Sequence, residues 1–304
     1  MSLSKESYFA GKNILVLGGT GFIGGHFVRT LSKQDYSVWT NYRGLPEPSK
    51  RYANVHYFFG DVLNPRDCER LIQHKDMVIM CAAETHGAKV MKENPGALVV
   101  PNLQMHINVL EACRINQVKH FVMISSSAIY PERDYPLKEE EGFVENPPEI
   151  YFGVGWMKRM VEKLCEFYSK TYGMICTVIR PSQIYGIDME TNPETAHMIP
   201  ALICRVLQGE NPLVVWGQPD VTRDFIYIDD FISTSLNIIA AKIQDPINVG
   251  TGILTTTAEV CNAIIQHTDR FRGHRPLDIQ YDTSKPTTIH TRKIHTGKST
   301  PYTP

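Results

Sequence analysis

The chain has 304 residues, of which 42% are hydrophobic, and its formal net charge is −1. This length and composition are sufficient for one large α/β domain, or for a domain with a smaller lobe. A charge near zero creates no field that would collect nucleic acid or an anionic membrane, so we expect neither as a partner. The first residues lack the apolar core of a signal peptide, and no apolar run approaches the ~20 residues of a membrane span, which predicts a cytoplasmic protein.

The cysteines and histidines indicate no metal site. Seven cysteines are scattered without a C-x-x-C pair, which favours reduced thiols that pack in the core over disulfides or zinc ligands. His290 and His295 lie five residues apart in a polar tail, a spacing more typical of a surface than of a metal centre.

The first predicted strand, residues 14–17, leads into a glycine-rich turn and then into a helical pattern. The turn holds Gly18, Gly21 and Gly24, with Phe22 and Ile23 between the last two glycines. A turn of this kind lets backbone N–H groups approach a pyrophosphate, whose charge the helix N-terminus stabilises. We therefore predict a dinucleotide site here; the alternative is a tight strand-to-helix connection without a ligand.

Strands and helices alternate along the first 185 residues. The predicted strands are residues 14–17, 37–40, 55–59, 77–81, 121–124 and 176–179, and the clearest helices are residues 104–116 and 154–172. This alternation implies right-handed crossovers and a parallel sheet covered on both faces, that is, a Rossmann-type doubly wound α/β fold in residues 1–185. The two helices are apolar on more than one side, which fits burial within one chain or a homodimer interface.

From about residue 186 the alternation breaks into pieces punctuated by Pro and Gly. Helical patterns recur near residues 199–207, 229–241 and 257–267. These pieces predict a smaller C-terminal substrate lobe, residues 186–304, with a cleft between it and the first domain. After Asp269 the sequence is polar and rich in Thr and Pro, and we expect it to be irregular.

Residues after the second, third and fourth strands are candidates for cofactor contacts. A carboxylate about 20 residues after the glycines would hold the ribose hydroxyls of NAD, whereas a basic residue suits the 2′-phosphate of NADP. The chain has Arg43 there, which favours NADP over NAD unless Arg43 is only a loop cation. Asp61 could accept a hydrogen bond from the adenine amino group, or cap the helix that starts near Pro65. Ala82 and Ala83 are small enough for a cofactor to lie close to the backbone.

The chain carries a set of motifs at residues 18–24, Gly60-Asp61-Val62, Ala82-Ala83, Asn102, residues 125–130 and residues 180–186. Together these motifs resemble the extended short-chain dehydrogenase/reductase family of nucleotide-sugar epimerases and dehydratases. The second lobe is similar to that of GDP-fucose synthases at residues 192–202, 214–217 and 223–230, and at Lys285-Pro286 and Arg292-Lys293. The resemblance implies NADP or NAD as cofactor, with contacts that include Val62 and Pro181. It also implies a nucleotide sugar, favouring a GDP-hexose, that contacts Ser127 and Gln183.

In that family a Ser, a Tyr and a Lys share the chemistry at the C4 hydroxyl of the sugar, and the Lys lowers the pKa of the Tyr. Ser126 and Lys158 match the Ser and the Lys, but Val154 stands where the Tyr belongs. Tyr151 is a possible substitute, because seven residues along a helix return to the same face within about 20°. Otherwise Tyr151 is a packing residue at the helix entry.

The resemblance to GDP-fucose synthases is incomplete at the epimerisation residues. His197 matches their proton-transfer histidine, but the partnering cysteine is Ala128 in this chain. His197 could therefore bind the sugar, move one proton or only fix a loop. Arg223 could clamp a diphosphate, because a guanidinium binds phosphate with two hydrogen bonds. Trp216 could stack on the nucleotide or belong to the core.

Three functions are compatible with these residues. The first is an NAD(P)-dependent oxidoreductase or epimerase of a nucleotide sugar with altered proton-transfer residues. The second is a protein that binds the same ligands without catalysis, which Val154 and Ala128 suggest. The third is a structural protein that assembles through its apolar helices.

Overall fold

The computed structural model describes residues 5–34, 36–44, 51–85, 94, 96–192, 196–284 and 289–304. Its centre is a seven-stranded parallel sheet with the strand order β10-β6-β5-β4-β1-β2-β3. The strands are β1 (Asn13–Leu17), β2 (Ser37–Tyr42), β3 (Val55–Phe59), β4 (Met77–Met80), β5 (His120–Ile124), β6 (Ile175–Pro181) and β10 (Ile247–Val249). The order changes direction between β1 and β4, which confirms the predicted Rossmann-type doubly wound α/β fold.

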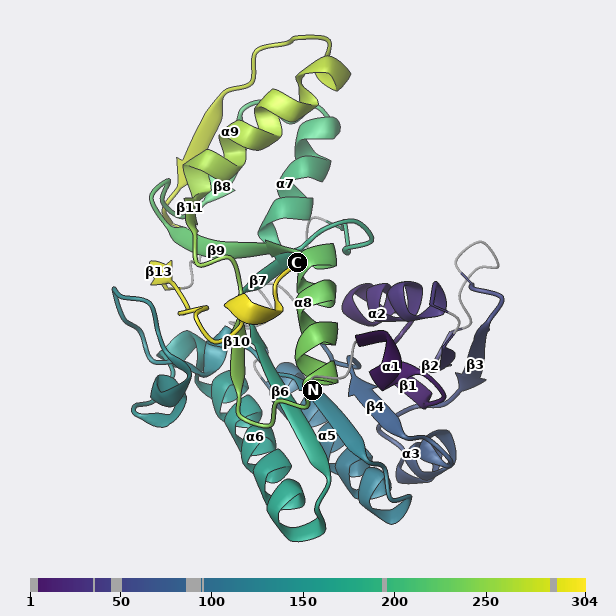
Figure 1. Ribbon diagram of the computed structural model, residues 1–304. Coiled ribbons are helices and arrows are strands. Elements are labelled where there is room, and N and C mark those ends of the chain that lie inside the picture. The colour runs from purple at the N-terminus through teal and green to yellow at the C-terminus, as the bar shows by residue number, and fades with distance from the viewer. Residues whose placement is uncertain are drawn as a thin grey trace.

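Helices cover both faces of this sheet (Figure 1). One face carries α1 (Lys5–Phe9), α2 (Phe22–Ser32) and α8 (Ile228–Ala240), and the other carries α3 (Pro65–Ile72), α5 (Gly96–Ile115) and α6 (Phe152–Tyr172). Side chains alternate along a strand, so Ile14 and Val16 enter the first core while Leu15 and Leu17 enter the second. Both faces are therefore buried, as the near-continuous apolar strands predict.

Helices α5 and α6 lie side by side on one face (Figure 1). Helix α5 starts at Gly96, eight residues before the predicted position, and runs through Pro101. A proline near a helix start removes one backbone hydrogen bond, which the packing of the rest of the helix outweighs. Helix α6 ends at Gly173, whose φ of 69° provides the left-handed cap.

A second group of elements forms the upper part of the molecule in Figure 1. Strand β9 (Thr222–Tyr227) pairs with β7 (Gln183–Tyr185), β11 (Leu254–Thr256) and β13 (Thr291–Arg292), and β8 (Leu213–Trp216) pairs with β12 (Ile279–Asp282). Helices α7 (Met198–Leu207) and α9 (Thr257–Thr268) pack on β8 around a core of their own. Its buried residues are Leu202, Val206, Leu213, Val215, Val260, Cys261 and Ile264.

The expectation of an irregular chain after Asp269 was wrong only where the short strands β12 and β13 lie. Both are short and mostly polar, and their partners β8 and β9 are distant in sequence, so no local pattern shows them. Strand β10 belongs to the large sheet and helix α8 packs on it, although both follow residue 186, where the second lobe was predicted to begin. The division into domains at residues 185 and 186 stays a prediction. Residues 193–195 and Lys285-Pro286, which carried part of the resemblance, lie outside the described residues.

Candidate active site

The glycine turn lies where β1 and β4 are neighbours, at the change of direction in the strand order. Gly18 has a φ of 77°, and a Cβ there would lie 2.6 Å from the backbone nitrogen of Ala82. A Cβ on Gly24 would lie 2.3 Å from the carbonyl oxygen of Gly18. Helix α2 begins directly after Gly21, with Phe22 and Ile23 as its first residues. The first N–H groups of a helix have no partner within it, so this turn fits the pyrophosphate of a dinucleotide.

Asn41, which the sequence analysis passed over, holds this turn in place. Its side-chain oxygen accepts from the Gly18 N–H at 2.8 Å, and its amide donates to the Gly60 carbonyl at 2.9 Å. Asn41 thereby ties the turn after β1 to the end of β3. The sequence signal that could have predicted this role is the position of Asn41 near the end of the second predicted strand, since that strand lies next to the glycine turn in a doubly wound sheet. Arg43 is exposed beyond it and forms an ion pair with Glu84 at 3.2 Å.

Asp61 follows β3, as expected, but it does not cap the next helix. Asn64 caps α3 by accepting from the Arg66 N–H, whereas Asp61 accepts from the Leu63 N–H at 3.0 Å. Asn64 lies directly before Pro65, the first residue of α3, whereas Asp61 lies too far before the helix to accept from its first N–H groups. The capping alternative for Asp61 is therefore wrong. Val62 is buried in the second core.

The loop after β4 is held from α5. The Asn102 side chain accepts from the Glu84 N–H at 3.0 Å and donates to the Glu84 carbonyl at 2.9 Å. Ala82 packs against the second core, and Ala83 is exposed. The side-chain amide of Asn102 therefore fixes this loop next to the glycine turn, because it binds both the N–H and the carbonyl of Glu84.

Ser126 and Lys158 come from adjoining segments. Ser126 caps a short 3-10 helix that starts at Ser127, and its hydroxyl accepts from the Ala128 N–H at 3.0 Å. A Cβ on Gly155 would lie 2.7 Å from the Ala128 carbonyl oxygen, so the start of α6 presses closely on this segment. The Lys158 ammonium donates to the Ile124 carbonyl at 2.8 Å, at the end of β5.

Val154 lies one helical turn before Lys158 and packs against the second core. Burial lowers the pKa of Lys158 to about 8, against the opposing effect of the Glu162 carboxylate. The Cys81 and Cys165 thiols also act on the Lys158 charge.

Tyr151 lies before α6 rather than in it, with φ −105° and ψ 2°. The argument that Tyr151 and Lys158 share a helical face therefore does not apply, because the helix begins at Phe152. The Tyr151 ring faces the Arg292 guanidinium, 5.9 Å from the ring centre, and its hydroxyl pairs with Arg223. A role for Tyr151 in proton transfer stays a prediction.

Arg223 and Arg292 are register partners on β9 and β13. Arg223 donates to the Ile289 and His290 carbonyls, at 2.5 and 3.0 Å. Arg292 is 6% exposed and donates to the Pro131 carbonyl at 2.7 Å. Its Nη2 is buried and has no hydrogen-bond partner among the described residues. Burial lowers the pKa of Arg292 to about 10. The pair therefore suits an anion.

The remaining predicted substrate residues lie in the second group of elements. Gln183 starts β7 two residues after Pro181, the buried end of β6. His197 precedes α7; it is exposed, although nearby protein atoms displace enough water to lower its pKa. Trp216 ends β8 and is 45% exposed, so it is not a core residue as the alternative proposed.

A buried ion pair beneath the site escaped the sequence analysis. Arg180 and Glu162 have side chains 1% and 2% exposed, and two hydrogen bonds of 3.0 and 2.6 Å join them. Ser125 donates to the same carboxylate at 2.5 Å, and Arg180 donates to the Tyr130 hydroxyl at 2.9 Å. Tyr130 in turn donates to Asn248 of β10 at 2.6 Å. This network joins α6, β6 and β10 directly behind Ser126.

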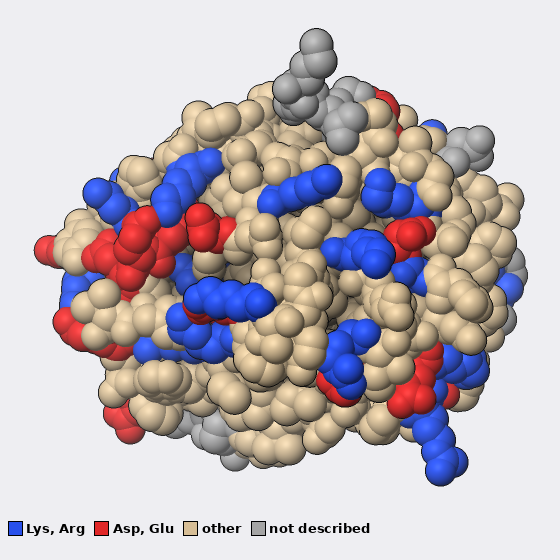
Figure 2. All heavy atoms as spheres, turned by 60° about the horizontal axis from the view of Figure 1, so that its bottom comes forward, with Lys and Arg blue, Asp and Glu red and all other residues tan. Residues whose placement is uncertain are grey.

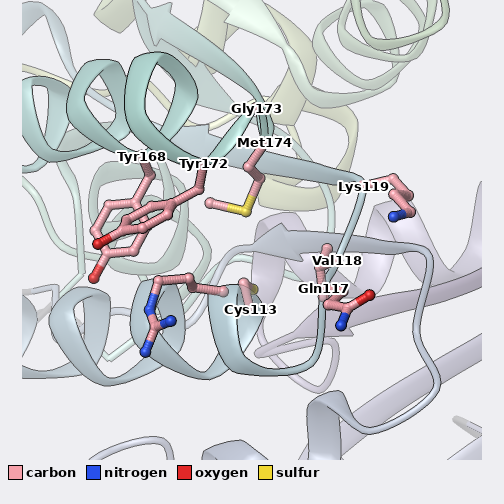
Figure 3. A pocket seen from close by; sticks show the side chains of 9 residues that line it. Cys113, Gln117, Val118, Lys119, Tyr168, Tyr172, Gly173 and Met174 are labelled. Atoms are coloured by element: carbon pink, nitrogen blue, oxygen red, sulfur yellow. The ribbon is translucent and has the colours of Figure 1, made fainter.

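The surface charges and one cavity lie apart from the glycine turn. Positive and negative side chains are interspersed on the face in Figure 2, in keeping with the small net charge. A cavity of about 360 Å³ lies near the amino ends of β5 and β6, where the rings of Tyr168 and Tyr172 lie together and the Met174 side chain extends toward them (Figure 3). This is the opposite edge of the sheet from the glycine turn.

All seven cysteines are free. The described residues contain no group of three or more His, Cys, Asp or Glu that could hold a metal ion. Within the same part of the chain, no helix is both long enough and apolar enough to cross a bilayer.

A glycine turn at the change of direction of a doubly wound sheet is the arrangement of Rossmann-type folds, and dinucleotides bind at this place in such folds. Comparison with known proteins makes this more specific. The chain belongs to the NAD dependent epimerase/dehydratase family, whose model matches residues 14–250. The family resemblance seen in the sequence is thereby confirmed.

Three similar proteins illustrate the range of this family. GDP-mannose 3,5-epimerase 1 of Oryza sativa subsp. indica is 28% identical over 277 residues, or 88% of this chain and 72% of that protein. GDP-L-fucose synthase of Escherichia coli K12 is 28% identical over 250 residues, or 76% of this chain and 72% of that protein. The structure of the UDP-glucose 4-epimerase of Thermus thermophilus in complex with NAD has a TM-score of 0.79 and 25% identity, over 95% and 92% of the two chains.

Proposed function

We propose that this chain is an NAD(P)-dependent oxidoreductase or epimerase of a nucleotide sugar, with a GDP-hexose as the favoured substrate. The observation that carries the proposal is the pair of Arg223 and Arg292, because a buried guanidinium nitrogen without a partner among the described residues suits a diphosphate. The names of the relatives from rice and Escherichia coli favour a GDP-sugar.

The cofactor residues of the proposal are those around the glycine turn. They are Gly18, Gly21, Phe22, Ile23, Gly24, Arg43, Asp61, Val62, Ala82, Ala83, Lys158 and Pro181. When bound, the nicotinamide would supply hydride acceptance and donation. The chain's own residues would hold its pyrophosphate at the start of α2 and keep water from the reacting carbon.

The substrate residues of the proposal are Ser127, Gln183, His197, Trp216 and Arg223, and the candidate proton-transfer residues are Ser126, Tyr151, Lys158 and His197. Ser126 would hydrogen-bond the reacting sugar oxygen, and Arg223 with Arg292 would hold the diphosphate. His197 is exposed, so it can reach a ligand without unfolding of α7. We place the protein in the cytoplasm.

Calorimetry tests this proposal directly. NAD, NADP, a GDP-hexose and a UDP-hexose are each titrated into the protein, and into Arg292→Leu. We expect a dinucleotide and a GDP-hexose to bind, with GDP-hexose binding at least tenfold weaker in the variant and dinucleotide binding unchanged. Absence of dinucleotide and nucleotide-sugar binding at millimolar ligand would contradict the proposal.

Removal of Arg43 tests the choice of cofactor. If Arg43 pairs with a 2′-phosphate, Arg43→Ala weakens NADP binding by about 1–3 kcal/mol, the scale of a charge-assisted hydrogen bond, and leaves NAD binding nearly unchanged. Glu84→Gln is the matched control, because it removes the carboxylate that now pairs with Arg43 and should not weaken NADP binding. Equal losses for NAD and NADP in Arg43→Ala would rule out a 2′-phosphate contact.

A second candidate function is a protein that binds these ligands without catalysis. Val154 and Ala128 favour it, because both replace residues that move protons in the family that the chain resembles. Turnover of a GDP-hexose with cofactor, abolished by Lys158→Ala, would exclude this alternative.

We also propose a homodimer, which the exposed apolar side chains on α5 and α6 support. Phe152, Trp156 and Met160 recur every four residues on α6, each 41–51% exposed, and Ile107 is exposed on α5. Met160→Glu should shift the protein to a monomer in sedimentation velocity, because it buries a charge in the interface. Met160→Leu, which keeps the apolar surface, should remain dimeric. A wild-type monomer at micromolar concentration would refute the dimer.

A further inference from the structure

The Lys158 ammonium lies at the carboxyl edge of β4 and β5. Met80 and Met123 are register partners, so the next residues along, Cys81 and Ile124, lie opposite each other. Lys158 donates to the Ile124 carbonyl at 2.8 Å, and its charge acts on the Cys81 thiol. The amine is therefore held beside the strand ends that adjoin the glycine turn.

His106 lies on α5, which packs against α6, the helix that carries Lys158, and it is used by none of the roles above. It lies one turn after Asn102, whose side chain holds the loop that follows Cys81. His106 is 1% exposed, and its Nδ1 donates to the Asn102 carbonyl at 2.7 Å, which leaves Nε2 as an acceptor. Nε2 is buried without a hydrogen-bond partner among the described residues. An unpaired buried acceptor is costly, so it calls for a donor.

Lys158 is the charged group that acts on His106. Burial, and then the Lys158 charge, lower the pKa of His106 to about 3, so the imidazole is neutral at physiological pH. A neutral imidazole with a free lone pair can accept a hydrogen bond from an ammonium or from a water that the ammonium orients. The other groups that face Lys158 are Cys81 of β4, and Glu162 and Cys165 of α6.

We infer that Lys158 is itself the proton-transfer group of this enzyme, and that His106 is its positioning residue, bonded through Nε2 and one water to the Lys158 Nζ. This inference rests on the proposed function. In the forward step the neutral amine takes the proton of a sugar hydroxyl: an N–H bond forms, the O–H bond breaks, and its electron pair stays on oxygen. Val154 leaves this side of the site without a phenol, and burial brings the Lys158 pKa to about 8, where the amine is available near neutral pH.

The link between His106 and Lys158 is tested without substrate or cofactor. Trace acetylation with acetic anhydride across a pH series, read by mass spectrometry on the peptide that holds Lys158, gives the pKa of this one amine. His106→Leu removes an acceptor that stabilises the ammonium, so we expect the Lys158 pKa to fall by about 1 unit. His106→Gln keeps an acceptor oxygen and should restore at least half of the shift.

His120→Leu is the matched control for this titration. His120 is equally buried, and its pKa is also lowered to about 3, but its hydrogen bonds go to Tyr8 and Thr177 and its charged neighbours are Lys242 and Lys12. Replacement of His120 should leave the Lys158 pKa unchanged. A Lys158 pKa that moves by less than 0.2 units in His106→Leu, or equally in both leucine variants, would overturn the role of His106.

The proton role of Lys158 is tested by the pH profile of turnover. In the direction of sugar oxidation, kcat/KM of the wild type should rise with pH through the Lys158 pKa found by acetylation, and the midpoint should move with it in His106→Leu. A profile midpoint that stays fixed while the amine pKa moves would overturn the role of Lys158. If no nucleotide sugar turns over, the proposed function and the proton role both fail, whereas the acetylation result still decides whether His106 positions Lys158.

Discussion

Glu162→Gln should destabilise the protein by about 3–5 kcal/mol, the usual cost of removing one partner from a buried ion pair. The substitution preserves the shape of the side chain but leaves the Arg180 guanidinium charged and 1% exposed, without its counter-charge. Arg180 also donates to the Tyr130 hydroxyl, which donates to Asn248 of β10, so displacement of Arg180 from the core would disrupt the link between β6 and β10. The loss should therefore appear as a loss of global stability.

Denaturant unfolding measures this free energy. An unchanged slope of the free energy against denaturant concentration would show that the surface exposed on unfolding is the same in the variant. Glu166→Gln is the matched control, one turn further along α6. Glu166 pairs with Lys163 and Lys170 at the surface, so its replacement should cost no more than about 1 kcal/mol.

The double variant Glu162→Leu with Arg180→Met should be more stable than either single variant, because no buried charge is left alone. Equal stability losses in Glu162→Gln and Glu166→Gln would contradict the importance of the buried pair.

Val154→Tyr should raise turnover of a GDP-hexose by about 10²–10⁴-fold, the usual contribution of a placed acid–base group. The new phenol would lie one helical turn before Lys158, beside the segment of Ser126, where the ammonium lowers the pKa of the phenol. The amine would then assist a stronger proton-transfer group instead of acting alone. Initial rates with cofactor, at a series of pH values, measure the effect.

Val154→Phe separates the hydroxyl from the ring. It fills the same space without a proton to exchange, so any gain in Val154→Tyr that also occurs in Val154→Phe would come from packing. Tyr151→Phe tests the competing assignment. If Tyr151 carried the proton, Tyr151→Phe would lower turnover by about 10²-fold or more, and Val154→Tyr would help little. Changes below about threefold, or ~0.7 kcal/mol in barrier, in both Val154→Tyr and Tyr151→Phe would rule out tyrosine-based proton transfer at these two positions.

The cofactor side of the site could be predicted to a large extent because its signals are local. Gly18, Gly21 and Gly24 directly follow a buried strand and open a helix, and that order of elements requires a tight turn whatever the rest of the chain does. Strand and helix periodicities are also local, so six of the seven strands of the large sheet were predicted within three residues at each end.

The proton-transfer side could be predicted only in part. The spacing of Val154 and Lys158 follows from one helix, but the position of Tyr151 depended on where that helix begins. Helix ends are set by capping and packing, and here the chain enters α6 through a short 3-10 turn that directs Tyr151 to Arg223 and Arg292.

The sequence by itself determined the doubly wound fold, the glycine turn and the replacement of a phenol by Val154, because each depends on residues within one or two elements. Only the tertiary structure decided that Arg292 adjoins Arg223, that Glu162 and Arg180 pair in the core, and that the Lys158 charge acts on the buried His106. These contacts join segments from 18 to 69 residues apart, as the pairing of Glu162 with Arg180 and of Arg223 with Arg292 shows. The physical reason is that burial brings charged and polar groups together only after the sheet has ordered the strands and helices that carry them.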